Sequence, residues 1–455
     1  MKLAILGGAG TRVPLVLVGL LRFHGDLGTD EVALWDINRD RQALIDRICA
    51  AMIGRYGVPI KVRTGKSAED ALDGADFILV SVRVGGTSTR VADEQIALSH
   101  GVLGQETVGP GGWAMALRTI PIVLEYARLA EKLAPSAWLL NFSNPVGIVL
   151  QALLAAGVGR TIGVCDTPRE LFESIAALLH VRSEQAFFDY LGLNHLGWVR
   201  SVQVNGRERL PELFAERERL AHAYHVPLFT GEYLRELELL PTEYVYFYLN
   251  AAQAVETLKQ AAHTRGQIVA RQEQQLFRAV RAGADDPGQL VSAYDHFLAS
   301  RNATYFQLET GTRVNQEKVD RARQELYEKT AGYERIAVDV MRAMARNRPA
   351  VFPVDVANNG SMDELDRLDA VEVPCVIDSN GARPLAVGAI PKQVRSLLLE
   401  VKEYERLTAK AALEGSARIA ATALAANPLV RDRKLADELT AEYLRAHRPH
   451  LGYLK

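Results

Sequence analysis

The sequence is short of several things, and each shortage excludes a class of protein. The three cysteines, Cys49, Cys165 and Cys375, are odd in number and widely scattered, which argues against a disulfide framework. Lys plus Arg number 53 against 55 Asp plus Glu, so the chain lacks the basic excess typical of nucleic-acid-binding proteins. No apolar run approaches the roughly 20 residues that span a bilayer, and the segment before the first glycines is too short for a secretory signal. We therefore expect a soluble, cytoplasmic protein that has neither a nucleic acid nor a membrane as its partner.

What the sequence does have is enough apolar material for a large core. The chain has 455 residues, of which 48% are hydrophobic, so we expect two domains or one large composite unit. In its first third, short apolar runs alternate with segments of helical spacing, a pattern that predicts a Rossmann-like, doubly wound parallel sheet. The runs interpreted as buried strands are residues 2–6, 31–35, 76–82, 137–143 and 161–165, and the clearest helices are 39–56 and 119–133.

The pattern changes after about residue 185. The stretch AFFDYLGLNHLGWVRSVQVNGRERL predicts strands joined by an Asn205-Gly206 turn. Helical stretches from about 210 to 348, a strand-rich patch and a helical C-terminus follow. We therefore divide the chain into an NAD-binding domain, residues 1–185, and a mixed α+β, largely helical domain for substrate, metal and oligomerisation, residues 186–455.

A glycine-rich loop follows the first predicted strand. In ILGGAGTRVP, the glycines Gly7, Gly8 and Gly10, with Thr11, stand between that strand and a helix, where backbone N–H groups can bind a pyrophosphate. Asp36 ends the second strand, where an acid accepts hydrogen bonds from the adenosine ribose and disfavours a 2′-phosphate. These features favour NAD over NADP, although Arg39 lies nearby. The alternative is a tight turn followed by a surface aspartate that caps a helix.

One cysteine and one histidine, Cys165 and His195, are candidate metal ligands. Cys165 ends the predicted strand in IGVCDTPRE, at the sheet edge where ligands gather, and His195 stands thirty positions later in GLNHLGW. A thiolate and an imidazole could hold an open divalent metal site completed by water and substrate oxygens. A lone residue of either kind is more often part of the core, and the spacing by itself is weak evidence for a metal site.

Several stretches, taken in order, carry a resemblance that covers nearly the whole chain. They include VRVGGTSTRVADEQIALSHGVLGQETVGPGGWAMALRTIPIVLEYA, NFSNPVGIV, VCDTP, GLNHLGW, PTEYVYFYLN, HTRGQ, VANNG, VEVPCVI and NPLV. Together they resemble the NAD- and divalent-metal-dependent glycosidases of glycoside hydrolase family 4, which do not use the usual pair of carboxylates. The run from Arg83 to Glu125 is most similar to the 6-phospho-β-glucosidases of that family.

The resemblance implies an unusual mechanism of hydrolysis. NAD removes hydride from C3 of the sugar, a base removes the acidified C2 proton, the aglycone leaves C1, water adds and the hydride returns. Cys165 and His195 would hold the cation, for which the resemblance implies Mn²⁺, although a Cys/His pair also suits Co²⁺, Ni²⁺ or Fe²⁺. The base resembles Tyr244, with Tyr246 and Tyr248 as rivals in the same stretch. A homo-oligomer, a dimer or a tetramer, is also implied.

Further residues resemble those that bind substrate in this family. Asn144 resembles a residue that contacts the sugar hydroxyls, and Glu106 either does the same or only orients its loop. Arg90 and Arg265 resemble residues near the charged end of the substrate. Asp166 departs from the phospho-β pattern, because Cys-Asp-Thr-Pro stands where that branch has Cys-Asn-Val-Pro. Our first choice of substrate is a 6-phospho-β-glucoside. The alternatives are an α-linked, unphosphorylated or otherwise anionic glycoside, an NAD-dependent hydroxyacid dehydrogenase, and a nucleotide-binding protein without catalysis.

Overall fold

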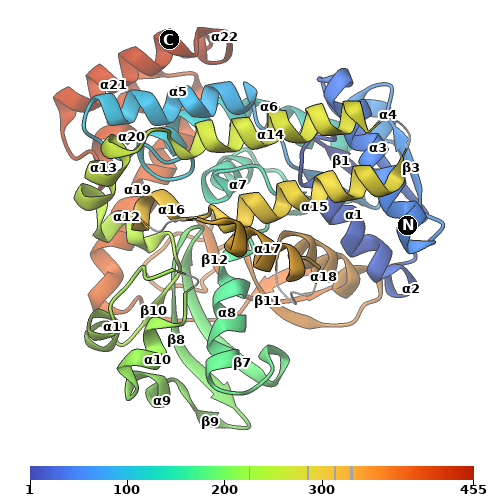
Figure 1. Cartoon of the computed structure of the whole chain (residues 1–455). Helices are drawn as coiled ribbons and strands as arrows, with labels where there is room; N and C mark the ends of the chain where they lie inside the picture. Colours follow the sequence, from blue (N-terminus) through green and yellow to red (C-terminus); the bar gives the residue numbers. More distant parts are fainter. Residues whose placement is uncertain (225, 284–285, 312–313, 328–331) are drawn as a thin grey trace.

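The fold is built on one large, mixed β-sheet. The computed structural model describes residues 1–224, 226–283, 286–311, 314–327 and 332–455 (Figure 1). The sheet has nine strands in the order β13-β12-β11-β6-β5-β4-β1-β2-β3. Its parallel strands come first in the chain: β1 (Lys2–Leu6), β2 (Glu31–Trp35), β3 (Lys61–Thr64), β4 (Phe77–Val80), β5 (Trp138–Asn141) and β6 (Thr161–Gly163). Three antiparallel strands extend it: β11 (Ala350–Ala357), β12 (Ala370–Asp378) and β13 (Gly381–Pro384).

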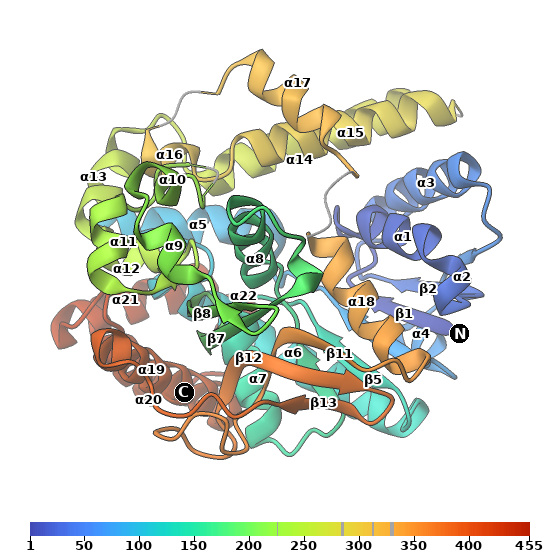
Figure 2. The same cartoon turned by 90° about the horizontal axis from the view of Figure 1, so that it is seen from below.

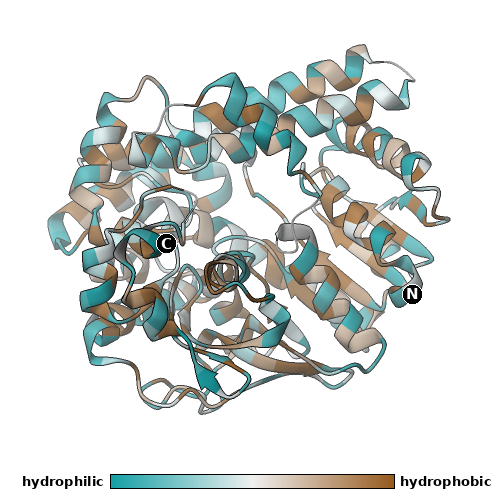
Figure 3. Ribbon diagram, turned by 60° about the horizontal axis from the view of Figure 1, so that its bottom comes forward, coloured by the Kyte–Doolittle hydropathy of each residue, from teal (hydrophilic) through white to brown (hydrophobic). Residues whose placement is uncertain are grey.

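Two groups of helices pack around the parallel strands. The strand order reverses between β1 and β4, so successive right-handed crossovers place the helices on opposite faces of the sheet. One group is α1 (Val13–Arg22), α3 (Arg39–Tyr56) and, from later in the chain, α18 (Tyr333–Ala345), with the short α2 (His24–Leu27) beside them. The other is α4 (Ala68–Leu72), α6 (Gly109–Leu133) and α7 (Val146–Ala155). The strands between them are strongly hydrophobic, as Figure 3 shows.

A smaller sheet lies against the large one. It contains the hairpin of β7 (Ala186–Leu193) and β8 (Leu196–Val204), with β9 (Arg207–Glu208) and β10 (Leu240–Pro241) pairing with β8. β7 packs on β12, and this contact joins the two sheets. The predicted Asn205-Gly206 turn is confirmed, and both residues have positive φ (50° and 74°), as a two-residue hairpin turn requires.

Several of the remaining helices lie at the carboxyl ends of the parallel strands. α14 (Arg265–Ala282) and α15 (Pro287–Ala303) run side by side across that edge in both views (Figures 1 and 2). Near them are α5 (Gly86–Ser99), α8 (Thr167–Leu178), α12 (Val245–Leu249), α13 (Ala251–Gln260), α16 (Gln307–Thr310) and α17 (Gln316–Gln324). The others are the short helix η1 (Ser183–Gln185), α9 (Leu210–Phe214), α10 (Arg217–Ala221), α11 (Gly231–Leu237), α19 (Lys392–Glu414), α20 (Ala417–Ala426), α21 (Arg433–Ala446) and α22 (Arg448–Leu451).

The predicted fold class is confirmed, with differences in detail. β3 was not predicted, because its sequence KVRT has one strongly apolar residue and half-exposed side chains. Helix α6 begins ten residues before the predicted 119, inside a glycine-rich run. A Cβ at Gly111 or Gly112 would lie 2.1 Å from the Gln105 carbonyl or 2.3 Å from the Thr107 carbonyl, so these glycines let the preceding loop lie against the helix.

The division of the chain into two domains at residue 185 stays a proposal. The large sheet contains strands from both sides of this position. Residue 185 lies between β6 and β7, yet β11, β12 and β13 come from beyond it and complete the sheet that begins at β1. Within the described ranges, none of the helices combines the length and the apolarity needed to cross a bilayer.

Candidate active site

A cavity of about 780 Å³ lies at the carboxyl ends of the parallel strands. Its walls include residues that directly follow β1, β2, β4, β5 and β6, and residues of α14, α15 and the loop after β10. This is the edge at which ligands bind in open parallel sheets, because loops and helix N-termini converge there. Of the predicted site residues, those that line the cavity are Gly7, Gly10, Thr11, Asp36, Arg90, Glu106, Asn144, Cys165, Asp166, His195, Tyr244 and Arg265.

The glycine loop has the backbone expected of a phosphate-binding turn. Gly7 has φ of 97°, and a Cβ there would lie 2.2 Å from the carbonyl oxygen of Ser81, so only glycine fits. The amides of Gly7 and Gly8 both donate to the Trp35 carbonyl, at 2.9 and 2.8 Å. Gly8 does not line the cavity, because it packs against β2, and its place is therefore structural.

The carboxylate of Asp36 holds this loop beside the second strand. It accepts hydrogen bonds from the amides of Ala9 (3.1 Å) and Asn38 (2.8 Å) while still lining the cavity. Arg39 is directed elsewhere: its guanidinium lies 3.9 Å above the Trp35 ring and donates to the carbonyl of Gly65. Arg39 is thus committed to other partners and does not offset the charge of Asp36.

Cys165 and His195 line the same cavity, although they come from different sheets. Cys165 follows β6 and is 7% exposed, and burial, followed by the charges of Glu372 and Asp166, raises the pKa of its thiol. His195 occupies the β7–β8 turn with φ of 64° and is 6% exposed, and burial lowers the pKa of its imidazole to about 4. A neutral imidazole and a thiol that ionises only with cationic help suit a metal site.

The described residues contain no group of three or more His, Cys, Asp or Glu side chains that could hold a metal ion. A cation held by Cys165 and His195 would therefore keep several positions open for substrate oxygens. Asn144 supports this arrangement, because its buried Oδ1 lines the cavity and has no hydrogen-bond partner among the described residues. A neutral acceptor of this kind is available to a sugar hydroxyl.

Of the three tyrosines proposed as rivals for the base, only Tyr244 lines the cavity in the described part of the chain. Its ring stacks on His195 with the ring centroids 3.9 Å apart and 5° between the planes. Its hydroxyl lies 2.9 Å from that of Tyr305, which donates its single proton to the Glu243 carboxylate (2.6 Å) and can therefore only accept from Tyr244. Burial, and next the charge of Glu243, raises the pKa of Tyr244, so this phenol needs a nearby cation to lose its proton. Tyr246 instead donates to the Glu309 carbonyl.

Glu106 joins two arginines in the wall of the cavity. Its Oε2 lies 2.8 Å from Arg83 and 2.9 Å from Arg90, and Arg90 also pairs with Glu94 at 2.9 Å. Burial opposes ionisation of Glu106, but Arg90 and Arg83 hold the pKa of its carboxyl well below the usual range. Glu106 thus orients the two arginine side chains, and their positive charges keep its carboxyl group ionised.

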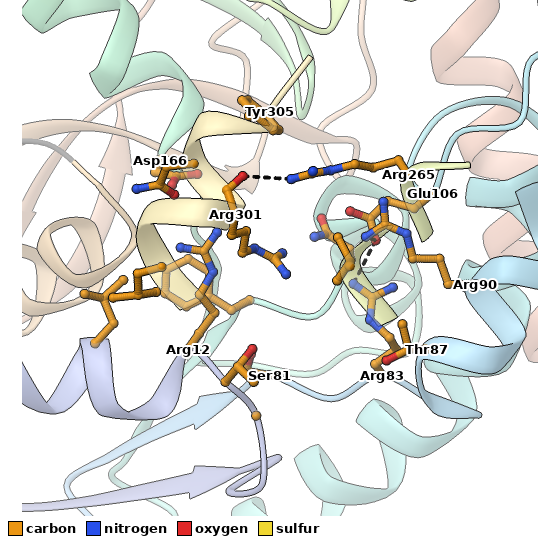
Figure 4. A pocket seen from close by; sticks show the side chains of 18 of the residues that line it. Arg12, Ser81, Arg83, Thr87, Arg90, Glu106, Asp166, Arg265, Arg301 and Tyr305 are labelled. Atoms are coloured by element: carbon orange, nitrogen blue, oxygen red, sulfur yellow. Dashed lines mark hydrogen bonds and ion pairs between the residues drawn. The ribbon is translucent and has the colours of Figure 1, made fainter. Parts of the chain in front are cut away.

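Other arginines also line this part of the cavity. Arg12, Arg265 and Arg301 converge on the open space beside the Glu106 cluster (Figure 4). In the described part of the chain, neither Arg265 nor Arg301 has an ion-pair partner, and Arg265 donates to the carbonyls of Thr304 and Arg301 at 3.0 Å. Burial, and next the charges of Arg12 and Arg265, lowers the pKa of Arg301 to about 9. Such a concentration of positive charge is suited to an anionic ligand.

Sequence reasoning missed several cavity residues. Arg12 and Arg83 stand directly after the first glycine loop and after β4, positions at which a strand-end rule could have found them. Arg301 and Tyr305 belong to α15 and the turn after it, where nothing in the local pattern distinguishes them from solvent-exposed helix residues. They reach the cavity only because α15 crosses the sheet edge.

Comparison with known proteins agrees with this geometry. The family model described as family 4 glycosyl hydrolase matches residues 2–181, and the model of its C-terminal domain matches residues 190–430. A 6-phospho-β-glucosidase of Escherichia coli is 30% identical, with 98% of this chain and 95% of that protein covered. A phospho-α-glucosidase of Clostridium acetobutylicum is 27% identical, with 100% and 99% covered.

Solved structures give the same result. The 6-phospho-β-glucosidase of Thermotoga maritima, determined with manganese, NAD⁺ and glucose-6-phosphate, superposes with a TM-score of 0.81 at 27% identity, covering 99% of both chains. The two family models together match most of this sequence, and the fold agrees over its whole length. This chain therefore belongs to family 4 of the glycosyl hydrolases.

Proposed function

We propose that this glycosidase hydrolyses 6-phospho-β-glucosides with NAD and a divalent cation, Mn²⁺ by analogy with its relatives. The observation that carries the substrate class is the pair of arginines, Arg265 and Arg301, placed in one cavity with Cys165 and His195. A neutral sugar would leave this positive charge without a partner, whereas a 6-phosphate would supply one.

The cofactor proposal draws on the loop after β1. The backbone at Gly7 and Gly10 is shaped for a pyrophosphate, and Asp36 offers acceptors to a ribose diol but would repel a 2′-phosphate. Because Arg39 is held by the Gly65 carbonyl and the Trp35 ring, we propose NAD and not NADP. The structures of relatives that contain NAD and manganese support the same choice.

When bound, NAD would accept and return a hydride, and the cation would polarise the two sugar oxygens nearest to it. The protein's part is to hold the sugar and move one proton. In our proposal Cys165 and His195 bind the cation, and Asn144 orients a hydroxyl through its free Oδ1. Tyr244 takes the C2 proton, which it can do only after a positive charge beside it has offset the effect of burial on its pKa.

The β linkage is our first choice because the longest matched stretch, Arg83 to Glu125, is most similar to the β-specific enzymes. Asp166 argues for the α linkage, since it departs from the β pattern. It stands at the N-terminus of α8 in the cavity wall, next to Cys165. α-Specific relatives match the chain almost equally well, at 27% identity compared with 30%. A homo-oligomer, as a dimer or tetramer, and a cytoplasmic location stay predictions.

Aryl glycosides test the proposal directly. The panel contains p-nitrophenyl α- and β-glucosides, each with and without a 6-phosphate, assayed with NAD⁺, Mn²⁺ and reductant, and with each of these omitted in turn. We expect p-nitrophenol only from the 6-phospho-β-glucoside, only with both cofactors, and without net NADH. Accumulating NADH would indicate a dehydrogenase, release from the α anomer would reverse the linkage, and no release from any sugar would refute catalysis.

A further inference from the structure

The hydrogen bonds around His195 determine which ring nitrogen carries its proton. Nδ1 of His195 lies 3.1 Å from the hydroxyl oxygen of Thr107, in the loop that connects α5 to α6. Both side chains are buried, with 6% and 5% of their surface exposed. A hydroxyl has a single proton, so the direction of this hydrogen bond depends on the other partner of Thr107.

That other partner is Gln105. Its Oε1 accepts hydrogen bonds from the backbone amides of Thr107 (2.5 Å) and Val108 (2.8 Å). Because two N–H donors face this atom, it is the amide oxygen and not the amide nitrogen. The Thr107 hydroxyl lies 3.0 Å from the same oxygen, which can only accept, so Thr107 donates its proton to Gln105. Towards His195, Thr107 is then left as an acceptor.

We infer that Thr107 is a positioning residue for the cation site: its hydroxyl, oriented by Gln105, holds His195 in the Nδ1–H tautomer. The lone pair of this neutral imidazole is then on Nε2, the nitrogen left to bind a cation. The inference rests on the proposed role of His195 as a ligand. It goes beyond that role because it assigns a function to two residues of the GQETVG loop, Gln105 and Thr107, that act through His195.

The loop that carries Gln105 and Thr107 is held rigidly enough for this task. At Gly111 and Gly112 in the first turn of α6, an added Cβ would meet the carbonyl oxygens of Gln105 (2.1 Å) and Thr107 (2.3 Å). The backbone of the loop therefore lies directly on the helix. The hydroxyl of Thr107 is thus oriented in advance, and no reorganisation is needed when a cation binds.

Mn²⁺ titration of the full-length protein, followed by the electron paramagnetic resonance signal of free Mn²⁺, tests the inference. Thr107→Val keeps the shape of the side chain and removes the hydroxyl, and we expect it to weaken Mn²⁺ binding about 10- to 100-fold, the usual effect of losing a partner of a metal-ligating histidine. Thr107→Ser keeps the hydroxyl and should restore most of the affinity. Thr440→Val is the matched control, because Thr440 is also 5% exposed and its hydroxyl has no partner among the described residues.

A second measurement reads the tautomer without any metal. In protein labelled with ¹⁵N-histidine, the His195 signals are identified by their loss in His195→Asn, and the parent should show the Nδ1–H pattern. Thr107→Val should lose this bias while Thr107→Ser retains it. A purely structural role of Thr107 would leave the tautomer unchanged.

The possible outcomes are distinct. Unchanged Mn²⁺ affinity in Thr107→Val, or an equal loss in Thr107→Ser, overturns the inference, since the hydroxyl would then be irrelevant. If Thr107→Val does not fold, Gln105→Met decides, because it removes the orienting oxygen and should also weaken binding. Cys165→Ser separates this test from the proposed function: if it binds Mn²⁺ like the parent, or if the parent binds none, the metal site itself is wrong.

Discussion

Gly163 offers a sharp test of how the sheet supports the candidate metal site. It is the last residue of β6, two positions before Cys165, and it lies opposite Asn141 of β5 and Asp355 of β11. A Cβ added to Gly163 would lie 2.6 Å from Cγ1 of Val146 and 2.7 Å from Cβ of Asp355. Both contacts are far inside van der Waals distance, and both neighbours are buried, so the strand or its neighbours must move.

The expected cost follows from these contacts. Inserting one methyl group into a packed core destabilises a protein by about 1–3 kcal/mol, so Gly163→Ala should lower the free energy of unfolding by that amount. The displaced end of β6 carries Cys165, so Mn²⁺ binding should weaken as well. Gly159→Ala is the matched control four residues earlier, because a Cβ there meets nothing within 4 Å, and it should change stability by less than about 0.5 kcal/mol.

Urea denaturation followed by tryptophan fluorescence measures the stability difference, and the free Mn²⁺ signal measures binding. If Gly163→Ala is as stable as Gly159→Ala, the packing argument is refuted. If it is destabilised but binds Mn²⁺ normally, the sheet position is tight but does not set the position of Cys165.

Three other predictions concern the site and its support. Tyr244→Phe should lower kcat about 10²- to 10⁴-fold while Mn²⁺ binding is retained, because the ring still stacks on His195. Because the pKa of His195 is lowered to about 4, the metal-free fold binds fewer protons than the unfolded chain at pH values between about 4 and 6.5. The contribution of His195 to the free energy of unfolding is therefore complete above about pH 6.5 and is lost as the pH falls towards 4. Urea titrations should show that, over this range, the parent loses about 3 kcal/mol of unfolding free energy relative to His195→Asn. Asp93→Asn breaks a buried ion pair with Arg118 (2.6 Å, both 2% exposed) and should cost about 3–5 kcal/mol in the same assay.

Each of these has a result that contradicts it. Full activity in Tyr244→Phe would move the base to another residue. A pH-independent difference between the parent and His195→Asn would mean that His195 is not held neutral. For Asp93, the control is Asp437→Asn, because the half-exposed pair of Asp437 with Arg433 (3.0 Å) should contribute less than about 0.5 kcal/mol. If both variants lose the same unfolding free energy, the buried pair contributes no more to stability than the exposed one.

The sequence predicted those parts of the fold whose signal is local. Strands 2–6 and 31–35 and helix 39–56 were predicted at the bounds the structure gives them, because each combines a clear apolar period with breakers at its ends. Strands 76–82, 137–143 and 161–165 were predicted two residues too long at their carboxyl ends, and the first two also began one residue too early. Most of the residues beyond these carboxyl ends line the cavity: Ser81, Val82, Phe142, Val164 and Cys165.

The candidate site was predictable in a different way. The glycine loop and Asp36 follow from local spacing, whereas pairing Cys165 with His195 required the resemblance, because the two lie on different sheets joined by the packing of β7 on β12. Arg301 and Thr107 could not be found from either source. Their roles depend on where a distant helix crosses the sheet and on hydrogen bonds within a loop, and neither leaves a periodic trace in the sequence.

The order of strands in the large sheet also bears on synthesis at the ribosome. β6 is hydrogen-bonded on its outer side by β11, which is translated almost two hundred residues later. Until that segment emerges, the nascent N-terminal half exposes an unpaired strand edge next to the thiol, a surface open to wrong pairing. The last third of the chain therefore completes the Rossmann half, and a truncated product that ends before residue 350 would leave that edge uncovered.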